Sequence, residues 1–133
     1  MMELQPDDNE GLRIIDLTGT LLDQSYVVQM WILRNCVFVW IGSAADKPRL
    51  GSLSTAIATR FSPMPLITSI VGLPEMEEQQ IAQRLARCTG RQCFVSCQLP
   101  DHVPELFAYV EKQITKRLTE EGVVKNKGTS YGT

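Results

Sequence analysis

The sequence predicts a single α+β domain with its helices gathered mainly on one face of a sheet. The chain has 133 residues, of which 44% are hydrophobic and 21% charged, as in an average globular domain. Its first half holds runs rich in Val, Ile, Phe and Trp joined by short turns, which indicates antiparallel strands. Its second half holds two stretches with apolar residues at helical spacing, which indicates amphipathic helices.

The first elements are predicted to be strands. Residues 13–17 alternate weakly and are β-branched, which indicates an early strand. Residues 26–33 and 36–41 are denser in apolar side chains, and only Arg34 and Asn35 separate them. Asparagine tolerates the left-handed backbone of a tight turn. These two runs therefore predict a hairpin.

The middle of the chain is less clear. Residues 42–51 read as a loop. Residues 50–61 are ambiguous, because their apolar positions fit both helical spacing and the alternation of a strand. The Ser-Pro-Met-Pro run at residues 62–65 predicts a break. Residues 66–71 then predict a strand that ends at Gly72.

The first helix is expected over residues 75–88, between Pro74 and Gly90. Acidic side chains lie in its first turn and arginines near its end, the charge order that the helix dipole favours. These residues are Glu75, Glu77, Glu78, Arg84 and Arg87. We therefore interpret the glutamates as stabilising the helix start, with no chemical role.

A strand over residues 93–99 and a second helix complete the predicted elements. Asp101 is a good N-cap, and Pro104 fits the first helical turn. Apolar residues then recur as one stripe until Gly122 ends the helix.

The predicted organisation is a domain over residues 11–122 between two flexible ends. Residues 1–10 are acidic and polar and read as an N-terminal arm, and residues 123–133 read as a C-terminal tail. The arm does not resemble a secretory signal, and no apolar run approaches the ~20 residues that span a bilayer. The net charge of −2 gives no general attraction to nucleic acid or an anionic membrane. We expect a cytoplasmic protein that also reaches the nucleus.

The hairpin carries the strongest functional signal. If Leu33 faces Cys36, one face is almost wholly aliphatic and should form the core under the helices. The opposite face is also apolar. In an antiparallel sheet with one face in water, apolar and polar side chains should instead alternate along each strand. Such apolar patches mark protein contacts, and tryptophan is enriched at their centres. The residues predicted to form a partner interface are Val27, Trp31, Leu33, Phe38 and Trp40. Alternatively, residues 50–61 form a helix that covers this face within the chain.

Catalytic chemistry has little support. We identify no catalytic, cofactor-binding or metal-ligating set, because the chain has one histidine and no Cys-x-x-Cys pair or phosphate-binding loop. His102 reads as a solvated residue near a helix start. The four cysteines, Cys36, Cys88, Cys93 and Cys97, read as reduced buried thiols. A small enzyme that uses one of these thiols is a further hypothesis, which thiol-alkylation kinetics would test.

Four short runs carry a family resemblance. They are FVWIG at residues 38–42, LITSIVG at 66–72, AQRLARCT at 82–89 and QCFVS at 92–96. In this order and spacing they resemble proteasome assembly chaperone 4, over roughly residues 12–118. The chain departs from the family in a longer loop, at residues 43–49, and in its extended N- and C-terminal arms.

The resemblance implies a non-enzymatic protein without cofactor. It would pair as a heterodimer with a proteasome assembly chaperone 3-like subunit, bind α subunits of the 20S proteasome and promote α-ring assembly. Whether the chain forms a homodimer when alone is left open. We assign α-subunit docking to Asp46, Lys47 and Arg49 in the long loop. The resemblance also implies a mainly antiparallel six-stranded sheet with two helices, with residues 53–59 as a strand.

A competing hypothesis is a homodimeric scaffold of the longin or roadblock type, in trafficking or GTPase regulation. A small α+β domain with an apolar sheet face fits that class too. The element order argues against it, because no helix is inserted early between strand pairs.

Overall fold

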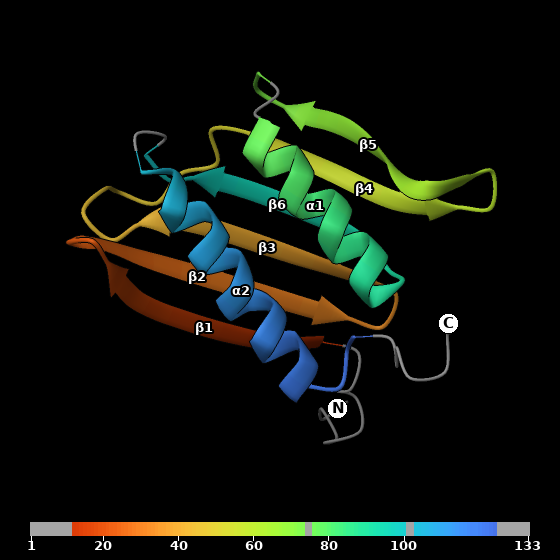
Figure 1. Ribbon diagram of the computed structural model, residues 1–133, viewed down its shortest axis with the longest axis horizontal. Helices are drawn as coiled ribbons and strands as arrows, with labels where there is room; N and C mark the ends of the chain where they lie inside the picture. The colour runs from red at the N-terminus through yellow and green to blue at the C-terminus, as the bar shows by residue number, and fades with distance from the viewer. Residues whose placement is uncertain (1–11, 74–75, 101–102, 125–133) are drawn as a thin grey trace, which may run out of the picture.

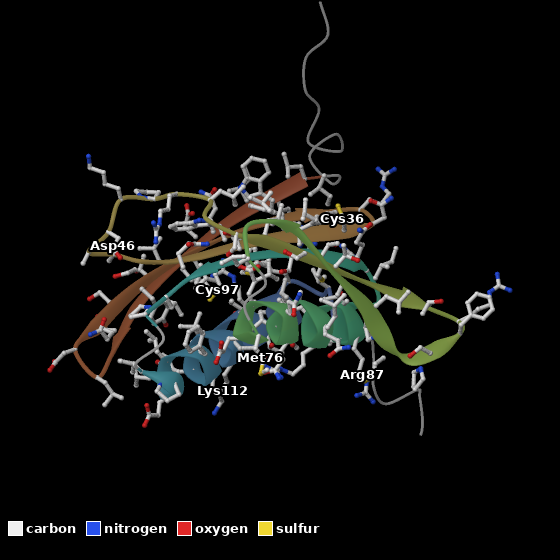
Figure 2. The ribbon with its side chains drawn as sticks, turned by 90° about the horizontal axis from the view of Figure 1, so that it is seen from above. Cys36, Asp46, Met76, Arg87, Cys97 and Lys112 are labelled. Carbon is white, nitrogen blue, oxygen red and sulfur yellow. The ribbon has the colours of Figure 1, made fainter. Side chains whose placement is uncertain are left out.

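The computed structural model describes residues 12–73, 76–100 and 103–124. It contains one six-stranded sheet, and both helices lie on the same face of it (Figures 1 and 2). The elements are β1 (Leu12–Leu21), β2 (Gln24–Leu33), β3 (Cys36–Ser43), β4 (Leu53–Thr59), β5 (Ser62–Val71), α1 (Met76–Thr89), β6 (Gln92–Gln98) and α2 (Pro104–Glu120). The predicted fold class and element order are confirmed.

The strand order is β1-β2-β3-β6-β4-β5. Neighbouring strands are antiparallel except β3 and β6, which are parallel. β6 therefore lies between the first three strands and the β4–β5 hairpin, which it places at the far edge of the sheet (Figure 1). The ambiguous middle segment is a strand, as the family resemblance implied.

The predicted hairpin register is confirmed. β2 and β3 pair from Tyr26 opposite Ser43 to Ile32 opposite Val37. The alternate residues that face the helices are buried, and they are Tyr26, Val28, Met30, Ile32, Val37, Val39 and Ile41. The helices pack on them with Ile81, Leu85, Leu106, Val110, Ile114 and Leu118. The core thus lies between the sheet and the helices.

The predicted break at residues 62–65 is wrong, because these residues begin β5. β5 is an edge strand, so Pro63 and Pro65 remove no hydrogen bond from a central ladder. The first strand is also longer than predicted, because β1 pairs with β2 along its whole length, from Leu12 opposite Leu33 to Leu21 opposite Gln24.

The start of α2 differs from the prediction. Its N-cap is Val103, which makes no side-chain capping hydrogen bond, and Pro104 occupies the first turn as expected. Asp101 lies outside the described residues. Gly122 follows the helix with a φ of +77°, a conformation that glycine adopts without strain. Val123 is still part of the core, although the predicted tail begins there.

Candidate protein interface

The helix-free face is the face of the sheet turned away from α1 and α2. Side chains alternate along each strand, so the register assigns it apolar residues from all six strands. They are Leu12, Ile14, Val27, Trp31, Leu33, Phe38, Trp40, Leu53, Ile57, Leu66 and Phe94. Figure 2, which views the sheet along its edge, shows both helices on the opposite side.

A row of large side chains crosses the helix-free face. Ile14 pairs with Trp31, Trp31 with Phe38, and Phe38 with Phe94 on four neighbouring strands. The rings of Trp31 and Phe38 meet edge to face, with centroids 6.0 Å apart. Trp31 is 40% exposed and Ile14 54% exposed. The row therefore forms a continuous, accessible apolar surface, of the kind that marks protein contacts.

The structure brings all five residues of the predicted interface together on this face. Trp31 is exposed, and Val27, Leu33, Phe38 and Trp40 are half-buried. The alternative in which residues 50–61 cover the face as a helix is wrong, because β4 lies within the sheet. Within the described residues no helix covers this face.

Two hydrogen bonds link three side chains, Asp16, Gln29 and Trp31, across β1 and β2. Gln29 Nε2 donates a hydrogen bond to Asp16 Oδ1 at 3.0 Å. Trp31 Nε1 donates to Gln29 Oε1 at 2.9 Å. Two polar side chains of the helix-free face therefore orient its exposed tryptophan. Sequence reasoning missed this link because Asp16 and Gln29 are distant in sequence.

The predicted docking residues Asp46, Lys47 and Arg49 are exposed and lie in the loop between β3 and β4. Figure 2 shows Asp46 at one end of the sheet, away from the helices. Trp40 Nε1 donates a hydrogen bond to the backbone carbonyl oxygen of Arg49 at 2.7 Å. The loop is thus attached to the helix-free face by one of its tryptophans.

Glu78 was predicted only to stabilise the start of the first helix through the helix dipole. This interpretation is incomplete, because the side chain of Glu78 is fully buried. Its carboxylate accepts hydrogen bonds from Ser52, Ser54 and Cys97. It borders a cavity of about 600 Å³ at the start of α1, which Phe107 and Leu99 also line. No local signal distinguishes this glutamate from its neighbour Glu77, which is half-buried. Glu75 lies outside the described residues.

All four cysteines are reduced thiols. Cys93 and Cys97 are buried, and Cys36 and Cys88 are half-buried. Burial raises the pKa of the Cys93 thiol to about 11, which keeps it protonated near neutral pH. Among the residues that the structure describes, no group of three or more potential metal ligands occurs. His102 lies outside them.

No helix in the described part of the chain is long and apolar enough to cross a membrane.

An α+β domain with one covered and one uncovered apolar sheet face is typical of protein-binding subunits. The family model of proteasome assembly chaperone 4 matches residues 25–99. The chain belongs to this family of proteasome assembly chaperones. It is 33% identical over 119 residues to mouse proteasome assembly chaperone 4, covering 89% of this chain and 94% of the relative. It is 32% identical over 104 residues to the human protein, covering 77% and 82%.

The fold also occurs in a solved structure, the crystal structure of a chaperone complex for yeast 20S proteasome assembly. The superposition has a TM-score of 0.67 and covers 84% of this chain and 98% of that chain. The sequence identity is 14%, so this similarity shows a shared fold.

Proposed function

We propose that the chain is a non-enzymatic chaperone that promotes assembly of the 20S proteasome α-ring. It pairs with a proteasome assembly chaperone 3-like subunit as a heterodimer, and the pair binds α subunits. The observation that carries the proposal is the helix-free face, which is apolar on every strand and which no helix covers within the described residues. Membership of the proteasome assembly chaperone 4 family supports the proteasome as the complex whose assembly is promoted.

The helix-free face has the composition of an interface centre. Stable interfaces bury about 800 Å² on each partner, and a few aromatic anchors contribute most of the binding energy. Trp31 and Phe38 are in ring contact on β2 and β3, and exposed Ile14 extends their row on β1. A partner sheet packed on this face would complete a two-layer sandwich.

The mechanism needs no turnover. A chaperone that binds an assembly intermediate more tightly than the finished ring shifts the population toward that intermediate. Release then follows when later subunits compete for the contact or clash with the chaperone. The chaperone is therefore released because the growing particle binds it less tightly, and release needs no nucleotide hydrolysis. We also propose that the protein is present in the cytoplasm and the nucleus, which imaging of the tagged chain would test.

The loop with Asp46, Lys47 and Arg49 is proposed as the α-subunit contact. It is exposed and projects at one end of the sheet, next to the helix-free face rather than across its centre (Figure 2). A partner sheet can therefore cover the aromatic row while the loop stays accessible. Its charged side chains would form a polar contact, which sets association rate and specificity more than affinity.

Binding of the purified chain to a purified chaperone 3 subunit tests the pairing. Trp31→Ala should reduce the affinity by about 100-fold, as expected for an aromatic anchor of an interface. Leu73→Ala is the matched control, because Leu73 is 81% exposed and lies in the turn after β5. Equal affinities for both variants and the wild type would remove the helix-free face from the proposal.

Capture of α subunits tests the loop separately. Asp46→Ala combined with Lys47→Ala should weaken capture by the chaperone pair while the pair itself stays intact. Arg49 is left unchanged, so that the loop backbone that accepts the Trp40 hydrogen bond is not disturbed. Unchanged capture would discard the loop as the docking element and leave the pairing unaffected.

A further inference from the structure

Charge is almost absent from the strands of this sheet. The six strands contain only two charged residues, Arg13 and Asp16, both in β1. Arg13 pairs with Ile32, whose side chain is buried beneath the helices, and Asp16 pairs with Gln29. Because side chains alternate, Asp16 is the one charge that the strands place on the helix-free face.

The only strand cation is already engaged elsewhere. Arg13 Nη1 lies 3.0 Å from Glu121 Oε1 and donates to the Glu121 carbonyl oxygen at 3.1 Å. This contact joins β1 to the end of α2, on the helix side of the sheet. The strands therefore offer no cation for Asp16.

Asp16 is held in a defined position. Its Oδ1 accepts from Gln29, which in turn accepts from the indole N–H of Trp31. In the described part of the chain, no hydrogen bond or ion pair reaches Asp16 Oδ2. The carboxylate thus keeps acceptor capacity for a group from outside the chain, close to the exposed aromatic residue Trp31.

Covering the helix-free face would remove water from this carboxylate. A carboxylate that loses water without gaining a cation or further donors is destabilised strongly. A second copy of this chain would bring another carboxylate and no strand cation. A partner with a cation opposite Asp16 would instead form a charge pair, and this difference discriminates between partners.

We propose that Asp16 selects the partner of the helix-free face. It favours a related sheet that presents a lysine or arginine opposite this carboxylate, and it disfavours a second copy of the chain. The inference rests on the proposed function, because it assumes that a partner sheet covers this face.

Asp16→Asn is the direct test. Asparagine has nearly the same shape, and its side-chain oxygen can still accept from Gln29, so the variant removes the charge and little else. Asp23→Asn is the matched control in the turn between β1 and β2. Asp23 has a φ of +64°, which asparagine tolerates, so the control loses the same charge outside the face without backbone strain.

Two affinities are measured for each chain. Sedimentation equilibrium gives self-association, and titration calorimetry gives binding to the purified chaperone 3 subunit. We expect Asp16→Asn to weaken binding to that subunit about tenfold or more and to strengthen self-association by a similar factor. Asp23→Asn should match the wild type in both measurements.

The remaining outcomes overturn the selection or separate it from the proposed function. Unchanged affinities, weaker subunit binding without stronger self-association, or equal effects of both variants each contradict selection by Asp16. If Trp31→Ala abolishes subunit binding and Asp16→Asn does not weaken it, only the selection fails. If the wild type does not bind the subunit, the proposed partner is wrong. The self-association measurement then tests the role of Asp16 by itself. Stronger self-association of Asp16→Asn would support Asp16 as a barrier to self-pairing. Unchanged self-association would overturn that role.

Discussion

The carboxylate of Glu78 accepts a hydrogen bond from the backbone N–H of Cys97 at 2.9 Å, which joins the first turn of α1 to the end of β6. It also accepts from the hydroxyls of Ser52 and Ser54, at 2.5 and 2.6 Å. Gln98 Nε2 donates to Ser52 at 3.1 Å and extends the network. Since Glu78 is fully buried, these donors replace the water that its carboxylate lost on folding.

Glu78→Ala should lower the free energy of unfolding by about 3 kcal/mol, because it leaves three buried donors without their acceptor. Urea denaturation followed by circular dichroism measures the change. Glu77→Ala is the neighbouring control, and its loss should stay below about 1 kcal/mol. Equal losses for both variants would contradict a specific role for the buried carboxylate.

Trp40→Phe should release the loop after β3, because phenylalanine keeps an aromatic ring but cannot donate to the Arg49 carbonyl oxygen. We expect faster trypsin cleavage after Arg49, in limited proteolysis followed by mass spectrometry. Lys47 precedes proline and is a poor trypsin site, so the readout is confined to Arg49. Phe38→Leu serves as the control, since Phe38 is an aromatic residue of the same strand and face whose side chain has no hydrogen-bond donor. Cleavage at the wild-type rate would show that the hydrogen bond does not restrain it.

Arg84 and Glu111 connect the two helices through paired hydrogen bonds, from Arg84 Nε and Nη2, each 2.6 Å long. The hydrogen bond to Glu111 raises the pKa of the Arg84 guanidinium above its ordinary value. Glu111→Gln should cost about 0.5 to 1 kcal/mol of stability at low salt, because Arg84 is 52% exposed and well solvated. The difference should shrink at 1 M salt as screening increases. Lys112→Gln, on the same helix, should leave stability unchanged, and a salt-independent loss in Glu111→Gln would argue for packing instead.

The Cys93 thiol should resist alkylation in the folded chain. Its pKa rises from 9.0 to about 11 on burial, so its thiolate fraction near pH 8 is about 100-fold lower than that of an exposed cysteine. The rate should increase with pH until the pKa is passed. Iodoacetamide labelling with peptide mass analysis measures this, and half-buried Cys36 is the internal reference. If Cys93 reacts faster than Cys36 at pH 8, the thiol-enzyme hypothesis returns.

Much of the fold was predictable because strand and helix patterns are local. Residues 26–33 and 36–41 are joined by a two-residue turn, which sets their register and thereby assigns every side chain to one of two faces. That register predicted both the buried aliphatic face and the five candidate interface residues. The α1 boundaries followed from its charges and from Gly90.

The remaining errors concern residues whose environment depends on distant segments. Pro63 and Pro65 signal a break locally, but they are compatible with a strand because β5 lies at the sheet edge. Glu78 resembles a solvated first-turn glutamate until β4 and β6 bring Ser54 and Cys97 to it. The Asp16–Gln29 contact likewise exists only because β1 pairs with β2.

The sequence by itself determined which residues form the core and which form a second apolar face, because alternation along a strand is a property of the backbone. It also determined that almost no charge enters the sheet. Only the tertiary structure decided that β6 lies between β3 and β4, and that the middle segment joins the sheet instead of covering its second apolar face. Strand order and helix placement arise from contacts between residues far apart in the chain, and local patterns carry no record of those contacts.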